Sequence, residues 1–150
     1  MFELKKIDFD ILVELSRNSR QSFRNIAKKI GCSVSTVIKR VSLLQENGII
    51  KEFTVSIDHH KLGYGYHALL EIETVQEKMN EVEEFLKKRK DVYAIYYVTG
   101  TKDIATLIRT KSQQELRNLL RAIAQLPSVE RMETRIIFDT PKESIGYINE

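Results

Sequence analysis

The sequence predicts an α+β protein made of two small domains. Three features support this prediction: short amphipathic segments before residue 50, alternating β-type and α-type segments after residue 65, and a polar stretch between them. The expected divisions are residues 1–50, a strand and hinge linker over residues 51–65, and residues 66–150. A length of 150 residues accommodates such a pair of domains.

The composition is that of an ordinary globular chain. Hydrophobic residues make up 42% of it and charged residues 30%, which leaves enough apolar mass for a core. No apolar run reaches the roughly 18 residues of a membrane span, and the first residues carry no apolar signal region. We therefore expect a cytoplasmic protein with no membrane partner. A single cysteine, Cys32, excludes an internal disulfide and a thiolate zinc site, and we expect no metal or other cofactor.

Three short helices are expected in the first domain. The first has a regular apolar stripe, and Asp8 is its expected N-cap. Ser22 and Ser33 are the expected N-caps of the next two, because a hydroxyl accepts hydrogen bonds from the free N–H groups of a first turn. Gly31 ends the second helix, since glycine enters the left-handed conformation at low cost. Helix, glycine-containing turn and helix is the pattern of a helix-turn-helix, here of the winged-helix-like kind.

The third helix has an apolar stripe and a polar, basic outer face. The stripe consists of Val34, Val37, Val41 and Leu44, with Ile38 at its edge. Hydroxyls and cations point the other way, with Arg40 on the flank: Ser35, Thr36, Lys39 and Ser42. Such a face suits the major groove of DNA, because Lys and Arg bind guanine edges or phosphates while Ser and Thr fit close to the base pairs. An ordinary amphipathic surface helix is the alternative.

The distribution of charge also favours DNA. Residues 1–50 contain nine Lys or Arg against five Asp or Glu, a balance of +4, whereas residues 51–150 contain fifteen against sixteen, a balance of −1. The basic half is therefore the helix-turn-helix half, as attraction to phosphate requires. We expect Gln21, Ser22 and Arg24 to anchor phosphate at the positive end of the second helix, and Ser33 to lie at the DNA surface as well.

The segment between the domains has the pattern of a strand followed by a hinge. Phe53, Val55 and Ile57 alternate with polar residues, which predicts a half-exposed strand that serves as a wing or as the start of a connector. Residues 58–65 are the expected hinge. The pair His59–His60 would point apart in a strand and has no third ligand near in the sequence, so we interpret it as solvated rather than metal-binding.

The second domain has the order β-α-β-β-α-β of a ferredoxin-like domain. The expected strands and helices, in chain order, are residues 66–74, 77–90, 92–99, 103–110, 112–125 and 129–139. In such a domain the two helices cover one face of the sheet. We expect aromatic and β-branched residues on the bare face, where they would pair with a second copy, so the protein should be at least a homodimer. A two-fold protein also presents two recognition helices to DNA half-sites.

Several segments together carry a resemblance to a known family: Ile7–Leu12 with Leu15, Ile26–Ala27, Ile30–Val37, Arg40–Val41, Leu44–Ile50 and Val98–Asp103. Over nearly its whole length the chain resembles the leucine-responsive/asparagine-responsive (Lrp/AsnC) family of bacterial and archaeal transcription regulators. The resemblance implies an N-terminal DNA-binding domain, a C-terminal effector domain and dimers that often assemble into octamers. It also implies an amino acid as the small-molecule effector.

The resemblance places this effector between dimers, at the turn made by Gly100, Thr101, Lys102 and Asp103, with Thr134 of a neighbouring subunit close by. Physical reasoning fits this placement. Gly100 allows the backbone to approach a ligand closely, exposed N–H groups can hold a carboxylate, and Asp103 can pair with an α-ammonium group. The alternative is a plain β-hairpin in which Asp103 bonds its own turn.

These features favour a sequence-specific transcriptional regulator that binds double-stranded DNA. An enzyme on the ferredoxin-like domain is disfavoured, because the sequence has no evident nucleophile–base pair, metal cluster or phosphate loop, and no catalytic residue is expected. An architectural, chromatin-like protein that binds DNA with little sequence preference would share every feature above. It stays open as the alternative.

Overall fold

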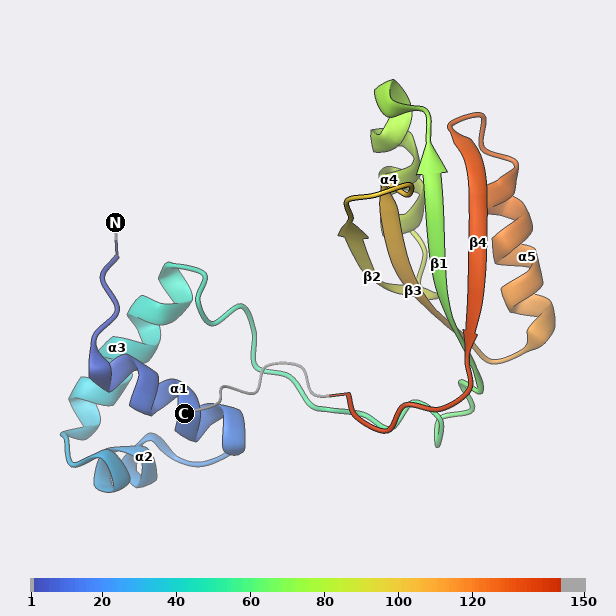
Figure 1. Cartoon of the computed structure of the whole chain (residues 1–150). Helices are drawn as coiled ribbons and strands as arrows, with labels where there is room; N and C mark the ends of the chain where they lie inside the picture. Colours follow the sequence, from blue (N-terminus) through green and yellow to red (C-terminus); the bar gives the residue numbers. More distant parts are fainter. Residues whose placement is uncertain (1, 144–150) are drawn as a thin grey trace. The chain divides into compact units, whose positions relative to one another are not determined.

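The computed structural model of the chain describes residues 2–143 and divides into two compact units. The first is built around the residues up to Ser56, and the second runs from Ile57 to Pro141. Figure 1 shows that the first unit is all helical, whereas the second combines one sheet with helices. Among the described residues, none of the helices has the length and apolar character needed to cross a membrane.

The first unit contains three helices. They are α1 (Lys6–Arg17), α2 (Phe23–Ile30) and α3 (Val34–Glu46). Their apolar faces meet in a small core of six buried residues: Ile11, Leu15, Ile26, Ala27, Val37 and Val41. The predicted stripe of α3 is thus buried at Val37, Val41 and Leu44. Val34 and Ile38 are exposed instead.

Two expectations about this unit were wrong. The N-cap of α1 is Lys5, not Asp8, which stands three residues later and accepts a hydrogen bond from the Lys5 backbone N–H (2.7 Å). An acidic residue at that third position is the other half of a capping box. The strand expected around Phe53, Val55 and Ile57 is also absent: residues 51–58 form no regular structure and are exposed. A strand needs a hydrogen-bonded neighbour as well as an alternating pattern, and no strand among residues 2–143 pairs with this segment.

The second unit is a four-stranded antiparallel sheet with two helices on one face (Figure 1). Its elements, in chain order, are β1 (Tyr66–Thr74), a 3-10 turn (Gln76–Lys78), α4 (Met79–Lys87), β2 (Val92–Tyr97), β3 (Ile104–Thr110), α5 (Gln113–Ala124) and β4 (Val129–Ile137). The strands lie in the order β2-β3-β1-β4. This is the predicted ferredoxin-like β-α-β-β-α-β arrangement, so the predicted α+β class is confirmed.

The covered face of the sheet forms an aliphatic core. It consists of ten buried residues from β1, α4, β3 and α5: Ala68, Leu70, Ile72, Val82, Leu86, Ile104, Ile108, Leu116, Leu119 and Ile123. Both helices contribute the faces that their sequence periodicity predicts. Because alternate residues of a strand point to opposite faces, the residues between these buried ones line the bare face.

The bare face carries fewer apolar residues than expected. Leu69 and Leu107 face each other across β1 and β3, but β1 and β4 add a row of charges. Arg135 Nη1 lies 2.9 Å from Glu71 Oε2, and its Nη2 lies 2.9 Å from Glu133 Oε1. The expectation of a face made of aromatic and β-branched residues was therefore wrong for the β4 side. There the residues that point to the bare face include Glu133 and Arg135.

Candidate nucleic-acid interface

The helix-turn-helix has the two serine caps and the glycine turn that the sequence predicts. Ser22 Oγ accepts from the backbone N–H of Asn25 (3.2 Å), and Ser33 Oγ accepts from that of Thr36 (3.1 Å). Gly31 ends α2 with φ +71°, in the left-handed region that favours glycine. These local contacts fix where α2 stops and α3 starts.

The outward face of α3 begins with a cluster of hydroxyl groups. Ser33 Oγ lies 2.8 Å from Ser35 Oγ and 2.8 Å from Thr36 Oγ1. We call Ser33, Ser35 and Thr36 the hydroxyl cluster. It stands at the N-terminal end of a 13-residue helix, where free N–H groups and the helix dipole favour anions such as phosphate.

Beyond the hydroxyl cluster, Lys39 and Ser42 are exposed on the same helix. Ile38 is also 48% exposed, although the sequence pattern placed it at the edge of the buried stripe. The sequence reasoning did not include Ile38 among the DNA contacts. Its place at the edge of the stripe, next to Lys39, is the sequence signal that could have indicated such a contact. An exposed aliphatic side chain on a reading helix can contact the methyl group of thymine.

Arg40 is oriented differently from the other candidates. Its guanidinium binds the carboxylate of Asp8 on α1 through two contacts, Nε to Oδ1 at 2.6 Å and Nη2 to Oδ2. The hydrogen bonds from Arg40 hold the pKa of Asp8 below its usual value, and Asp8 raises the pKa of Arg40. The sequence prediction placed this cation on the DNA-facing flank, but here its charge is paired within the unit.

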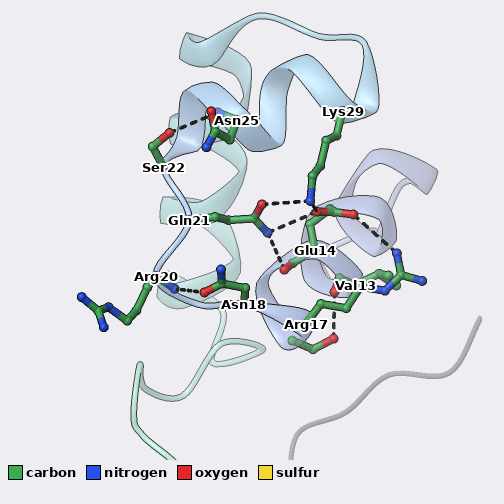
Figure 2. A network of polar contacts seen from close by, with 10 residues as sticks. Val13, Glu14, Arg17, Asn18, Arg20, Gln21, Ser22, Asn25 and Lys29 are labelled. Carbon is green, nitrogen blue, oxygen red and sulfur yellow. Dashed lines mark hydrogen bonds and ion pairs between the residues drawn. The ribbon is translucent and has the colours of Figure 1, made fainter.

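Gln21 likewise takes part in a network between α1 and α2, shown in Figure 2. Its Nε2 donates to the carbonyl oxygen of Glu14 (2.6 Å), and its Oε1 accepts from Lys29 Nζ (3.2 Å). Lys29 Nζ also binds Glu14 Oε2, and this contact lowers the pKa of Glu14. Gln21 therefore braces two helices, whereas the neighbouring Ser22 and Arg24 are exposed.

The turn between β2 and β3 contains the predicted effector residues. Gly100 has φ +120°, which favours glycine, and Thr101 is exposed. Lys102 Nζ lies 2.8 Å from Glu73 Oε2. The Asp103 side chain bonds β1 and not its own turn: its Oδ2 accepts from the backbone N–H (2.7 Å) and hydroxyl (3.1 Å) of Thr74. Across the turn, the Asp103 backbone carbonyl accepts from the Val98 N–H (2.9 Å).

The two residues on β1 that hold this turn, Glu73 and Thr74, were not predicted. They lie 29 positions before Lys102 and Asp103, and only the pairing of β1 with β3 brings them together. Thr134 lies on β4 opposite Leu70 and is exposed. Among the described residues, no three His, Cys, Asp or Glu side chains are grouped so as to hold a metal ion.

Helix-turn-helix and ferredoxin-like units in one chain define a class of protein, the two-domain DNA-binding regulators. Comparison with known proteins identifies the family. Residues 4–51 match the family model described as winged helix-turn-helix DNA-binding, and residues 67–147 match the Lrp/AsnC ligand binding domain. The chain belongs to the Lrp/AsnC family. Its members are DNA-binding transcriptional regulators and not enzymes, which confirms that part of the sequence prediction.

Individual relatives agree with this assignment. The HTH-type transcriptional regulator FL11 of Pyrococcus horikoshii is 36% identical over 141 residues, which cover 94% of this chain and 93% of that protein. The HTH-type transcriptional regulator LrpA of the same organism is 35% identical over 133 residues, or 88% and 94% of the two chains. The structure of Bacillus subtilis LrpC has a TM-score of 0.84 at 25% identity, with 94% and 99% coverage. Escherichia coli AsnC shares the fold, with a TM-score of 0.87 at 24% identity and coverage of 95% and 97%.

Proposed function

We propose that this transcriptional regulator is sequence-specific and reads DNA with the outward face of α3. The observation that carries the proposal is the row formed by the hydroxyl cluster, Lys39 and Ser42 on one side of a capped helix, in which every residue except the half-buried Thr36 is exposed. Serine and threonine hydroxyls bind base edges and phosphates, and lysine binds guanine or phosphate. Exposed Val34 and Ile38 add apolar surface for thymine methyl groups.

Phosphate contacts around this row come from the start of α2 in our proposal. Ser22 and Arg24 are exposed there, next to the positive end of the helix. Gln21 is hydrogen-bonded to Glu14 on α1 and to Lys29 on α2, so it holds the start of α2 in place and its effect on DNA binding is indirect. Arg40 is likewise left out of the direct contacts, since its guanidinium is bound to Asp8.

Replacing Lys39 tests the DNA-binding face. We expect Lys39→Ala to weaken binding to a duplex that the wild-type chain selects from a randomised pool. If Lys39 touches phosphate, the slope of log affinity against log salt also falls by about one. Lys88→Ala, at an exposed lysine of the second unit, is the matched control and should change neither quantity. Unchanged affinity and slope in Lys39→Ala would remove this face from the interface.

The runner-up function, an architectural DNA-binding protein, differs in specificity alone. Competition of the selected duplex against random duplex of equal length separates the two. A regulator should favour its site by roughly 10³-fold or more. Equal binding to both duplexes would favour the architectural function.

We further propose that the second unit binds an amino acid, between dimers and at the turn of Gly100–Asp103. Two features support this: the open backbone at Gly100 and the exposed Thr101. Lys102 and Asp103 hold this turn against β1 through Glu73 and Thr74. A structure of the same fold, NMB0573 of Neisseria meningitidis, was solved as an L-Met complex. An effector bound there changes DNA affinity only if it binds one assembly state better than another. Light scattering with and without each amino acid tests for a change of assembly, and titration calorimetry tests for binding. If no amino acid changes the mass of the assembly and none gives a heat of binding, the proposal is contradicted.

The domain limits also stay a proposal: DNA-binding residues 1–50, linker 51–65, effector and oligomerisation residues 66–150. Limited proteolysis should cut first in the exposed, irregular segment 51–58 and release two resistant fragments. First cuts elsewhere would argue for other limits. We propose a homodimer as the basic assembly, with an octamer as the higher form, acting in the cytoplasm where the DNA lies.

A further inference from the structure

The ion pair of Arg40 and Asp8 joins the proposed reading helix α3 to α1. The two residues lie 32 positions apart in the sequence and meet through a two-point contact of guanidinium and carboxylate. The Asp8 side chain is completely buried, and that of Arg40 is only 15% exposed. A contact so placed is shielded from salt and has a fixed geometry.

The same guanidinium also fastens the segment that leads into α1. It lies over the ring of Phe2, 5.3 Å from the ring centroid. Asp8 Oδ2, which binds Arg40, in addition accepts from the backbone N–H of Lys5. One cation thus connects α3, the first turn of α1 and the chain before it.

The location of Arg40 on α3 gives this contact its importance. It stands at the border between the buried stripe, which includes Val37 and Val41, and the outward face, which includes Lys39. Apolar packing is non-directional, so the stripe alone leaves α3 some freedom to turn about its own axis. The planar guanidinium fork fits a carboxylate in one orientation only, and a turn of the helix would break it.

We propose that Arg40 is a positioning residue for DNA recognition. It binds no DNA, and through Asp8 it fixes the rotation of α3 that directs Ser35, Lys39 and Ser42 at the base edges. This inference rests on the proposed DNA-binding function. It has a distinctive consequence: the charge of Arg40 neutralises Asp8, not phosphate, so its removal affects the discrimination between DNA sequences and not the salt dependence of binding.

The test uses the full-length chain, the duplex that the wild-type chain selects, and random duplex of equal length. In the double variant Asp8→Leu/Arg40→Met, apolar side chains replace the ion pair, an exchange that commonly preserves stability. A thermal melt followed by circular dichroism shows that the variant is folded. We expect its affinity for the selected duplex to fall by about tenfold to a hundredfold, comparable to one mismatched base pair. Its affinity for random duplex and its salt slope should match the wild type.

A second variant, Arg40→Lys, keeps the charge and loses the fork. It should show the same selective loss, and it keeps the inference testable if the double variant does not fold. Wild-type discrimination in a folded variant would overturn the inference. A parallel loss for both duplexes, with the salt slope of the double variant lower by about one, would also overturn it, because Arg40 would then bind phosphate. If the wild-type chain itself binds no DNA, it is the proposed function that fails.

Discussion

The two units of this chain hold their elements together by different means. In the first, ion pairs with one buried partner join the helices: Asp8 with Arg40, and Glu14 with Lys29. In the second, the aliphatic core is continuous and the ion pairs lie outside it, as between Lys87 and Glu83 on the surface of α4. The cores differ accordingly, with six buried apolar residues in the first cluster and ten in the second.

The difference shows what a small helical unit lacks. In a sheet, hydrogen-bonded ladders fix how each strand lies against the next, and packing then fixes the helices on the covered face. Three helices around six apolar side chains have no such ladder. Directional polar contacts between helices supply the missing constraint, and in this unit they occur on the helices that the proposed function requires to be oriented.

The largest expected effect is a loss of stability in the second unit. Leu70→Ala removes a fully buried side chain from the middle of β1, which should lower the free energy of unfolding by about 2–5 kcal/mol. Urea unfolding measures the loss, and hydrogen exchange should place it in residues 66–137. Leu69→Ala, next to it on the bare face, is the matched control and should cost clearly less. Equal losses would mean that the bare face is as well buried as the covered one.

Acid should affect the first unit through its buried carboxylates. The pKa values of Asp8 and Glu14 lie below their usual range, because Arg40 and Lys29 bind them. A depressed pKa contributes stability that is fully present above the unfolded value of about 4 and is lost as the pH falls through the folded value. The hydrogen-exchange protection of α1 to α3 should therefore decrease below about pH 4.

Added salt should distinguish the acid response of the first unit from that of the second. Glu73 and Glu83 also have lowered pKa values, caused first by Lys102 and Lys87, but their side chains are partly exposed. Salt should screen those pairs and leave the Asp8–Arg40 pair almost unchanged. The variant Asp8→Leu/Arg40→Met should flatten the acid response of the first unit. An unaltered response in that variant would assign it to other groups.

Sequence reasoning predicted local features well because they depend on neighbouring residues. The caps at Ser22 and Ser33 and the left-handed turn at Gly31 are all present, since each needs only residues within one helical turn. The order of strands and helices in the second unit was predicted for the same reason. Apolar residues recur every two positions in a strand and every 3.6 in a helix, and both patterns can be seen in a short run of consecutive residues.

Features that join distant segments could not be predicted in this way. Nothing near Arg40 in the sequence indicates Asp8, 32 positions earlier, so an exposed DNA contact was the natural expectation. For the same reason the sequence predicts a phosphate contact at Gln21, whereas in the fold Gln21 lies against α1 and Lys29. The strand expected near Val55 failed differently, because its pattern is right but no strand of residues 2–143 lies beside it.

The smallest expected effect compares one type of cap in both units. Ser33 and Ser112 each accept a hydrogen bond from a backbone N–H three residues on, at 3.1 Å. Replacing either by alanine should lower the free energy of unfolding by about 1 kcal/mol. Only Ser33 also contacts Ser35 and Thr36, so Ser33→Ala should in addition weaken binding to the selected duplex, while Ser112→Ala binds like the wild type. Equal DNA binding by the two variants would limit the hydroxyl cluster to capping, and Ser33→Thr, which keeps a hydroxyl at the cap, should restore most of both losses.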